Sequence, residues 1–304
     1  MALNFGREKG TAEISIDRNL CTLCGICVEV CKGGPLVIEN EQLTVRLDGL
    51  FGCIACGGCV AFCPTGAIQV SGRDLFPQDI LSFDDKSADS PYGSLQQLLL
   101  SRRSSRSFLD RDVEPGIVQK ILDSASTSPM GLPPSNVGVL VFSGQKAVHA
   151  LQQDLVKELP KMMLFLTPFT IALMRPFISK DQFEMYRGFV IPSARAFLEK
   201  DAEGEDWILY NAPLAFYFFG DENCDTGDPI VAASCAMFAA ESLGLGTCML
   251  GFAPYLFQYS PKLRKKYALP ARLLPGIMLI CGYRRYHPQR AIRRRFGRVE
   301  IFRE

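Results

Sequence analysis

Beyond about residue 95, apolar and polar positions follow the two rhythms that distinguish helices from strands. In residues 114–126, Ile117, Ile121 and Ala125 recur at helical spacing behind Pro115, which predicts an amphipathic helix. Helical patterns also cover residues 95–104, 144–159 and 181–200. Apolar runs of strand length predict strands at residues 137–142, 213–220, 247–251 and 276–283, and the first of these is expected to be buried.

A further helix is predicted between the strands at 213–220 and 247–251. Asp228 is a favourable N-cap and Pro229 suits the first helical position, and the small-residue run IVAASCAMFAAESLG follows them. Helices therefore alternate with strands through this part of the chain. The alternation predicts an α+β or an α/β fold, and periodicity alone leaves both open.

Cysteines dominate the beginning of the chain, where eight of the twelve fall between positions 21 and 63. They form two C-x2-C-x2-C-x3-C runs that align without a gap 32 residues apart, which indicates an internal duplication. The first residues, MALNFGREKG, contain no apolar signal segment, so we expect a cytoplasmic protein with metal-binding thiols instead of a disulfide scaffold. The first run is Cys21, Cys24, Cys27 and Cys31, and the second is Cys53, Cys56, Cys59 and Cys63.

Thiolates are the soft ligands that iron–sulfur clusters require, although C-x2-C pairs also bind zinc. Two such runs are better suited to bind two cubic iron–sulfur clusters than two tetrahedral zinc ions. Their spacing resembles that of bacterial two-cluster ferredoxins. In that family the fourth cysteine of each run ligates the other cluster. The resemblance therefore implies one [4Fe–4S] cluster on Cys21, Cys24, Cys27 and Cys63, and a second on Cys53, Cys56, Cys59 and Cys31. The second run ends in Cys63-Pro64 as the family does, whereas the first continues to Lys32.

Charge divides the chain at the end of the cysteine-rich part. Residues 1–85 carry a net charge of −5 and residues 86–304 one of +6. Between the parts, SFDDKSADSPYGS at 82–94 is polar and turn-forming. We predict a two-cluster domain over 1–85, a linker over 86–94 and a second domain over 95–304. The richest apolar run is the 13 residues from Met162 to Met174, which is too short for a membrane span.

Four segments of the second domain carry candidate chemistry. RRSSRSF at 102–108 places guanidinium groups beside hydroxyls, a combination that binds phosphate. SPMGLPPSN at 128–136 is a loop whose glycine allows backbone approach to a flat ligand. In ESLGLGTCMLG at 241–251 the helix precedes the glycines, which disfavours a Rossmann dinucleotide site.

The last of the four is the arginine-rich stretch at 284–303, which contains eight arginines and one acid. A phosphate or a nucleic acid could bind there. The acidic first domain and the scarcity of interleaved aromatic residues disfavour nucleic acid, so none is expected as a partner.

In this order and spacing, the four segments resemble the nitroreductase family of FMN flavoproteins across residues 95–304, and the whole chain resembles a ferredoxin–nitroreductase fusion. The resemblance implies an α+β fold with a central sheet flanked by helices. It also implies a homodimer with FMN bound between the subunits. The implied ligands of the FMN phosphate and ribityl chain are Arg102, Arg103, Ser104, Arg106, Arg294 and Arg295. Those of the isoalloxazine ring are Pro129, Met130, Gly131, Leu132, Asn136, Met249, Leu250 and Gly251.

The expected reaction is electron transfer through two clusters to FMN, followed by reduction of a small aromatic or apolar acceptor. Ferredoxin or NAD(P)H is the expected donor. No general acid is evident, since His149 and His287 adjoin no nucleophile motif. Residues 158–210 match no motif and could form core, a dimer contact or a cover over the flavin. An electron-transfer subunit with no substrate of its own is the alternative function.

Overall fold

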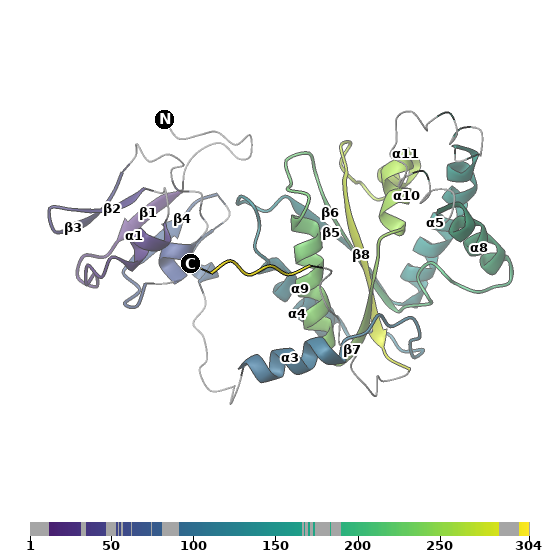
Figure 1. Ribbon diagram of the computed structural model, residues 1–304, viewed down its shortest axis with the longest axis horizontal. Helices are drawn as coiled ribbons and strands as arrows, with labels where there is room; N and C mark the ends of the chain where they lie inside the picture. Colours follow the sequence, from purple (N-terminus) through teal and green to yellow (C-terminus); the bar gives the residue numbers. More distant parts are fainter. Residues whose placement is uncertain are drawn as a thin grey trace. The chain divides into compact units, whose positions relative to one another are not determined.

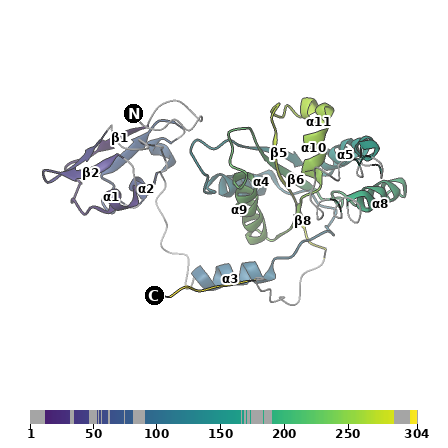
Figure 2. The ribbon, with the colours of Figure 1, turned by 45° about the horizontal axis from the view of Figure 1, so that its top comes forward.

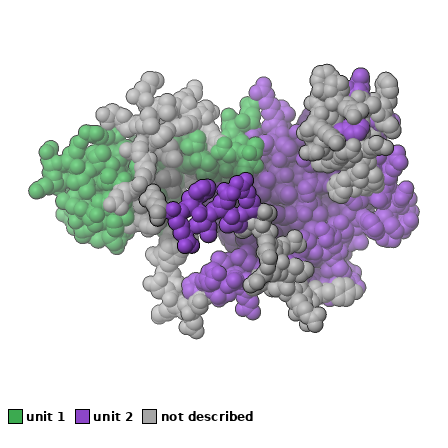
Figure 3. Space-filling view, viewed as in Figure 1, with its two compact units in different colours: residues 1–88, 130–136, 222–228 green, residues 89–129, 137–221, 229–304 purple. Residues whose placement is uncertain are grey.

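The computed structural model describes residues 12–31, 35–46, 53, 55, 57–61, 63–73, 75–80, 91–165, 167, 170, 173, 183, 190–285 and 298–303. The chain divides into two compact units, coloured separately in Figure 3. The first consists of Met1–Ala88 with the loops Met130–Asn136 and Glu222–Asp228, and the second contains the rest. This division falls within the predicted linker, and the domain bounds that we derived from the sequence stay a prediction.

Two antiparallel pairs of short strands build the first unit. β1 (Glu13–Ile16) pairs with β4 (Ile68–Ser71), and β2 (Leu36–Glu39) pairs with β3 (Gln42–Val45). The short helices are α1 (Ile26–Val30), α2 (Gly58–Ala61) and the 3-10 turn η1 (Pro77–Asp79). Leu36, Leu43, Ile68 and Val70 form a small core with the cysteines of both runs. A core of this size stabilises a domain only weakly, so bound metal would add substantially to its stability.

A four-stranded antiparallel sheet organises the second unit, in the order β5-β6-β8-β7. The strands are β5 (Val137–Ser143), β6 (Leu214–Gly220), β7 (Leu245–Leu250) and β8 (Leu274–Tyr283). The antiparallel pairing decides between the two classes that periodicity had left open. The predicted α+β fold is confirmed.

Helices cover both faces of this sheet, as Figures 1 and 2 show. One face carries α4 (Pro115–Ser126) and α9 (Asp228–Ser242), and the other carries α5 (Gln145–Phe165), α8 (Ile191–Ala202), α10 (Ala253–Tyr259) and α11 (Pro261–Lys266). Side chains of β6 alternate between the two cores, with Phe216 and Phe218 towards α9 and Tyr217 towards α10. α3 (Pro91–Ser101) precedes these elements in the chain.

The prediction of a buried strand at 137–142 is wrong in part. β5 forms, but among the described strands it lies at the edge of the sheet and pairs with β6 alone. Val139 and Val141 are 36% and 37% exposed, because no described helix covers them. An unbroken apolar run does not reveal whether a strand is central or at an edge.

The buried carboxylate of Glu158 joins α5 to the segment between α10 and α11. Glu158 accepts hydrogen bonds from Ser260 Oγ (2.9 Å) and from Lys161 Nζ (2.7 Å). Ser260 Oγ also accepts from the Leu263 N–H at 3.2 Å and so caps α11. Burial opposes ionisation of Glu158, but these hydrogen bonds prevail and lower the pKa of its carboxyl. Among the described helices, none combines the length and the apolar character that crossing a membrane would require.

Ser260→Ala should lower the free energy of unfolding at pH 7 by about 1–2 kcal/mol, because it removes both the α11 cap and a bond to a buried carboxylate. Urea denaturation measures this difference, with Ser126→Ala at the exposed end of α4 as the control. Glu158 has a depressed pKa when folded, so its stabilisation is present above the unfolded pKa of about 4.3 and is lost as the pH falls further. The cost of Ser260→Ala should therefore be smaller at pH 3. A cost equal to that of Ser126→Ala at pH 7 would contradict the assignment.

Candidate functional site

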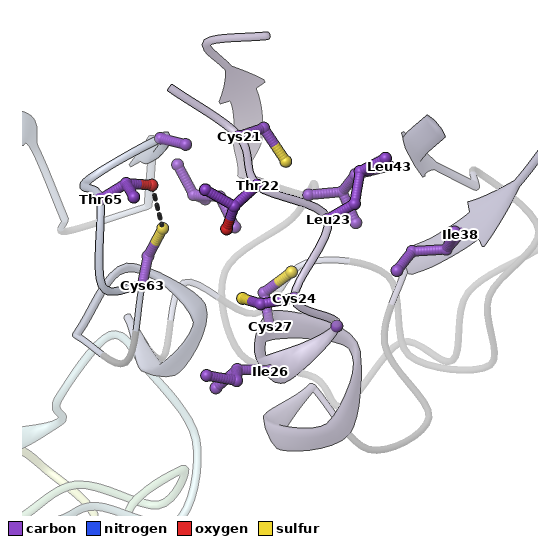
Figure 4. A pocket seen from close by; sticks show the side chains of 13 residues that line it. Cys21, Thr22, Leu23, Cys24, Ile26, Cys27, Ile38, Leu43, Cys63 and Thr65 are labelled. Atoms are coloured by element: carbon purple, nitrogen blue, oxygen red, sulfur yellow. Dashed lines mark hydrogen bonds between the residues drawn. The ribbon is translucent and has the colours of Figure 1, made fainter. Parts of the chain in front are cut away.

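Thiols from both cysteine runs line one pocket in the first unit. Cys21, Cys24 and Cys27 come from the loop before α1 and from α1 itself, and Cys63 follows α2. Their sulfur atoms point towards a common space in Figure 4. The walls are largely apolar, although Cys24 and the side chains of Leu23, Ile26 and Ile38 are exposed to solvent. The other lining residues are Thr22, Leu23, Gly25, Ile26, Ile38, Leu43, Thr65, Ala67 and Ile68.

The duplication seen in the sequence recurs in the backbone around the cysteines. Gly25 and Gly57, at equivalent positions, have left-handed φ values of 77° and 72°. Two residues earlier, Leu23 and Ala55 have φ values of 55° and 58°. Side chains with a Cβ adopt this region only at a cost, so the same strained turn occurs in both runs. The duplicated sequence therefore adopts the same local turn in both halves of the domain.

The electrostatics of the pocket favour a positively charged occupant. Burial raises the pKa of the Cys27 thiol, and the nearby thiols of Cys24 and Cys21 raise it further. At Cys63 burial acts in the same direction. There, however, hydrogen bonds from the Thr65 side chain, whose Oγ1 lies 3.7 Å from Sγ, and from neighbouring backbone N–H groups lower the pKa of the thiol. Thiolates that repel one another in a pocket require a cationic centre to hold them ionised.

The donor set fits an iron–sulfur cube. A [4Fe–4S] cube takes one thiolate at each iron, so its ligands surround a space and do not converge on a point. Among the described residues, no three His, Cys, Asp or Glu side chains meet closely enough to hold a single metal ion. For the second predicted set, Cys31, Cys53 and Cys59 are described and Cys56 lies outside the described residues.

In the second unit, residues 102–108 form an extended segment, which we call the arginine arm, after α3. Ser104 forms a parallel bridge with Thr247 of β7, and the Ser105 N–H donates to the Thr247 carbonyl at 2.7 Å. At its far end Phe108 bridges to Arg284, which follows β8. The arm therefore crosses from β7 to the end of β8.

Guanidinium groups of the arginine arm have no anionic partner among the described residues. Arg103 Nη2 is buried and has no hydrogen-bond partner among the described residues. None of Arg102, Arg103 and Arg106 forms an ion pair with a described carboxylate. Arg73 Nε and Tyr217 Oη are also buried without described partners, but only Arg103 lies in a segment predicted to bind a ligand. A buried donor at such a position fits an anion such as a phosphate.

A loop that carries no recognised motif adjoins the arm. The guanidinium of Arg106 lies 5.7 Å from the centre of the Tyr210 ring. Tyr210 and Asn211 have left-handed φ values of 57° and 50°, and Asp206 holds their loop by accepting from the N–H groups of Ile208, Leu209 and Asn211 at 2.8–2.9 Å. Non-glycine residues in this conformation cluster at functional sites, so Tyr210 joins the candidate site.

Cys248, which lies beside the same arginines, is buried. Burial raises the pKa of its thiol, although Arg106, Ser104 and Arg102 act in the opposite direction. The thiol is therefore neutral and packs as a small apolar group.

The end of β7 offers an open stretch of backbone. Met249 and Leu250 are half-buried, and Gly251 follows them with no atom within 4 Å of the place where a Cβ would lie. Gly246, earlier in β7, differs because its close neighbours are the protein side chains of Arg284 and Ser105. Among the described residues, the Gly251 end of β7 is therefore open, whereas the Gly246 position is closed by side chains.

The predicted flavin loop is described with the first unit from Met130 to Asn136, whereas Pro129 belongs to the second. The Gly131 N–H donates to Asp228 Oδ1 at 3.2 Å, and a Cβ on Gly131 would overlap the Asp225 carboxylate. Gly131 therefore serves close packing between two loops. We had predicted Asp228 as the N-cap of α9. In the structure this helix begins at Asp228 itself, and the Asp228 carboxylate accepts the hydrogen bond from Gly131. Arg294, Arg295 and His287 lie outside the described residues.

Comparison with protein families now decides the class of the second unit. Residues 99–283 match the model of the Nitroreductase family. The chain belongs to the nitroreductase family. Residues 20–68 of this nitroreductase-family chain match a 4Fe-4S dicluster domain. The predicted resemblance to a ferredoxin–nitroreductase fusion is confirmed, and the chain is an oxidoreductase.

One solved structure supports the nitroreductase fold, and a second has a lower TM-score. A nitroreductase with bound FMN from Bacteroides fragilis NCTC 9343 is 14% identical and covers 69% of this chain and 98% of its own, with a TM-score of 0.51. One from Desulfitobacterium hafniense DCB-2, also with bound FMN, is 16% identical and covers 68% of this chain and 98% of its own, with a TM-score of 0.48. At these identities the likeness shows the fold alone. None of the curated proteins matches the chain.

Proposed function

We propose that this nitroreductase-family oxidoreductase relays electrons through two [4Fe–4S] clusters to FMN and reduces a small aromatic or apolar acceptor. The observation that carries the proposal is the pocket in which three thiols of the first run meet Cys63 of the second. A cluster carries one electron and a flavin two, so clusters on the same chain are suited to supplying a flavin. The family match supplies the flavin half of this combination.

The proposed ligand sets exchange one cysteine between the two runs. One cluster is assigned to Cys21, Cys24, Cys27 and Cys63, and the other to Cys53, Cys56, Cys59 and Cys31. The pocket lining supports the first set directly. The matching left-handed turns at Gly25 and Gly57 support a second site of the same kind.

For FMN, we assign the phosphate to the arginine arm, through Arg102, Arg103, Ser104 and Arg106, with Arg294 and Arg295 from the tail. The unpartnered Arg103 Nη2 is the strongest support for this assignment. The isoalloxazine ring is assigned to Pro129, Met130, Gly131, Leu132, Asn136, Met249, Leu250 and Gly251. The relative from Bacteroides fragilis, with its bound FMN, supports the choice of cofactor. When bound, FMN supplies the hydride or electron chemistry, and these residues bind and orient it.

A homodimer would cover apolar surface that the second unit leaves exposed. On α3, Tyr92, Leu95 and Leu99 are exposed at helical spacing. Val299, Ile301 and Phe302 near the C-terminus are exposed as well. Exposed apolar side chains that cluster on a surface often mark a protein interface. Ferredoxin or NAD(P)H is the proposed donor, and the cytoplasmic location stays a prediction from the sequence.

Protein purified without oxygen should contain about eight irons and eight acid-labile sulfides per chain, because two cubes of four irons are proposed. Metal analysis and a sulfide assay measure this. Cys63→Ser should lower the iron content, whereas Cys235→Ser, at a cysteine outside both runs, should not. Stoichiometric zinc without labile sulfide would contradict the two-cluster proposal.

Denaturation should release FMN, and Arg103→Ala should weaken FMN binding by about 1.5–3 kcal/mol through loss of a charged hydrogen bond to phosphate. Fluorescence titration of the deflavinated protein measures the dissociation constant. Arg195→Ala on the exposed side of α8 is the matched control and should bind FMN as the unaltered protein does. Release of FAD, or unchanged affinity in Arg103→Ala, would argue against the arginine arm as the phosphate site.

A further inference from the structure

A buried ion pair lies behind the arginine arm. The carboxylate of Glu241 on α9 pairs with the guanidinium of Arg284, and their side chains are 1% and 9% exposed. The other oxygen of Glu241 accepts a hydrogen bond from Thr247 Oγ1 at 2.6 Å. Both carboxylate oxygens therefore have a partner, and the charge of Arg284 is neutralised. A buried pair that is fully hydrogen-bonded fixes the geometry of the elements that it joins.

The ion pair extends directly to the arm. Arg284 Nε donates to Ser105 Oγ at 3.3 Å, while the Ser105 N–H donates to the Thr247 carbonyl at 2.7 Å. Ser105 is thus held from β7 through its backbone and from the end of β8 through its side chain. Its sequence neighbours Arg103, Ser104 and Arg106 take their positions from this attachment.

Gly246 brings these groups close to the sheet. A Cβ at this position would lie 2.4 Å from Arg284 Cγ and 2.6 Å from Ser105 Oγ, distances that real Cβ atoms do not show. The φ of Gly246 is not in the left-handed region, so space and not backbone conformation requires the glycine here. The arm and Arg284 therefore pack directly on the backbone of β7.

The two kinds of arginine differ in what they can bind. Arg284 is enclosed and already paired with Glu241, so it has no charge to offer a ligand. Arg103 has a buried nitrogen without a described partner. A phosphate would therefore bind the arm arginines, while Arg284 supports them from behind.

We propose that Glu241, Thr247 and Arg284 are positioning residues that hold the arginine arm in the conformation that recognises the flavin phosphate. The inference rests on the proposed function, since it takes FMN as the ligand. It assigns to these residues the preference for FMN over riboflavin, which has the same ring system and ribityl chain but no phosphate. Disturbing the support should weaken FMN binding selectively.

The test compares FMN and riboflavin dissociation constants for the full-length protein, with thermal stability measured in parallel. Gly246→Ala should weaken FMN binding about tenfold and leave riboflavin binding unchanged, because the added methyl displaces Ser105 and Arg284 from β7. Gly116→Ala is the matched control, since no atom lies within 4 Å of its Cβ position on α4. Ser105→Ala, which removes the bond from Arg284 Nε and the 3.5 Å bond that Ser105 Oγ donates to the Arg103 carbonyl, should weaken FMN binding about threefold. Ser126→Ala, at the exposed end of α4 and outside the arm, is its control.

A selective loss of FMN affinity in Gly246→Ala and Ser105→Ala, with both controls unchanged, supports the proposal. Equal losses for FMN and riboflavin would overturn it, because they would indicate general damage to the flavin site. Unchanged FMN affinity in both variants would overturn it too. If Gly246→Ala does not fold, Ser105→Ala decides alone. If the unaltered protein binds neither flavin, the proposed function itself fails, and this inference fails with it.

Discussion

The antiparallel pairing of β7 with β8 is the constraint on which the second unit's candidate site depends. The pairing places Thr247 opposite Cys281, and Arg284 directly follows the last residue of β8. Two hydrogen bonds attach the arginine arm to these strands. The Ser105 N–H donates to the Thr247 carbonyl, and Arg284 Nε donates to Ser105 Oγ. The same strand then ends in the open backbone at Gly251. The hydrogen bonds between β7 and β8 thus set the distance between the proposed phosphate site and the proposed ring contact at Gly251.

The first unit is organised by a different constraint, the small size of its apolar core. Its described core consists of a few aliphatic side chains and the cysteines themselves. The repeated left-handed conformations of Leu23 and Ala55 store strain that a bound cluster would offset. Folding and metal binding are therefore expected to be coupled in this unit, whereas the second unit has two apolar cores of its own.

Local patterns in the sequence predicted most of the elements, because helical and strand periodicities are local properties. α4 and β6 formed where the patterns predicted them, and α5 continues past its predicted end through Pro160. Strand pairing is not local, so periodicity could not separate α+β from α/β, nor place β5 at an edge.

The cysteine and arginine motifs were found because clustered residues of one type carry their chemistry in adjacent positions. Contacts between distant residues were missed for the opposite reason. Glu241 and Arg284 are 43 residues apart, and although each begins one of the four candidate segments, no sequence pattern pairs them. Asp206 supports Tyr210 through backbone N–H groups, which leave no signal in side-chain chemistry. Such supporting residues become visible only when the fold brings them together.

The central claim is that the cysteine-rich unit supplies electrons to the flavin. The most direct test is anaerobic stopped-flow measurement of flavin reduction by reduced ferredoxin, in the FMN-loaded protein and in a full-length Cys21→Ser/Cys53→Ser variant that lacks one ligand of each proposed cluster. Dithionite reduction of both proteins controls for the integrity of the flavin site. The account predicts that the variant's flavin accepts electrons from ferredoxin far more slowly while it still responds normally to dithionite. Equal rates with ferredoxin would show that electrons reach the flavin without the clusters, and would contradict the account.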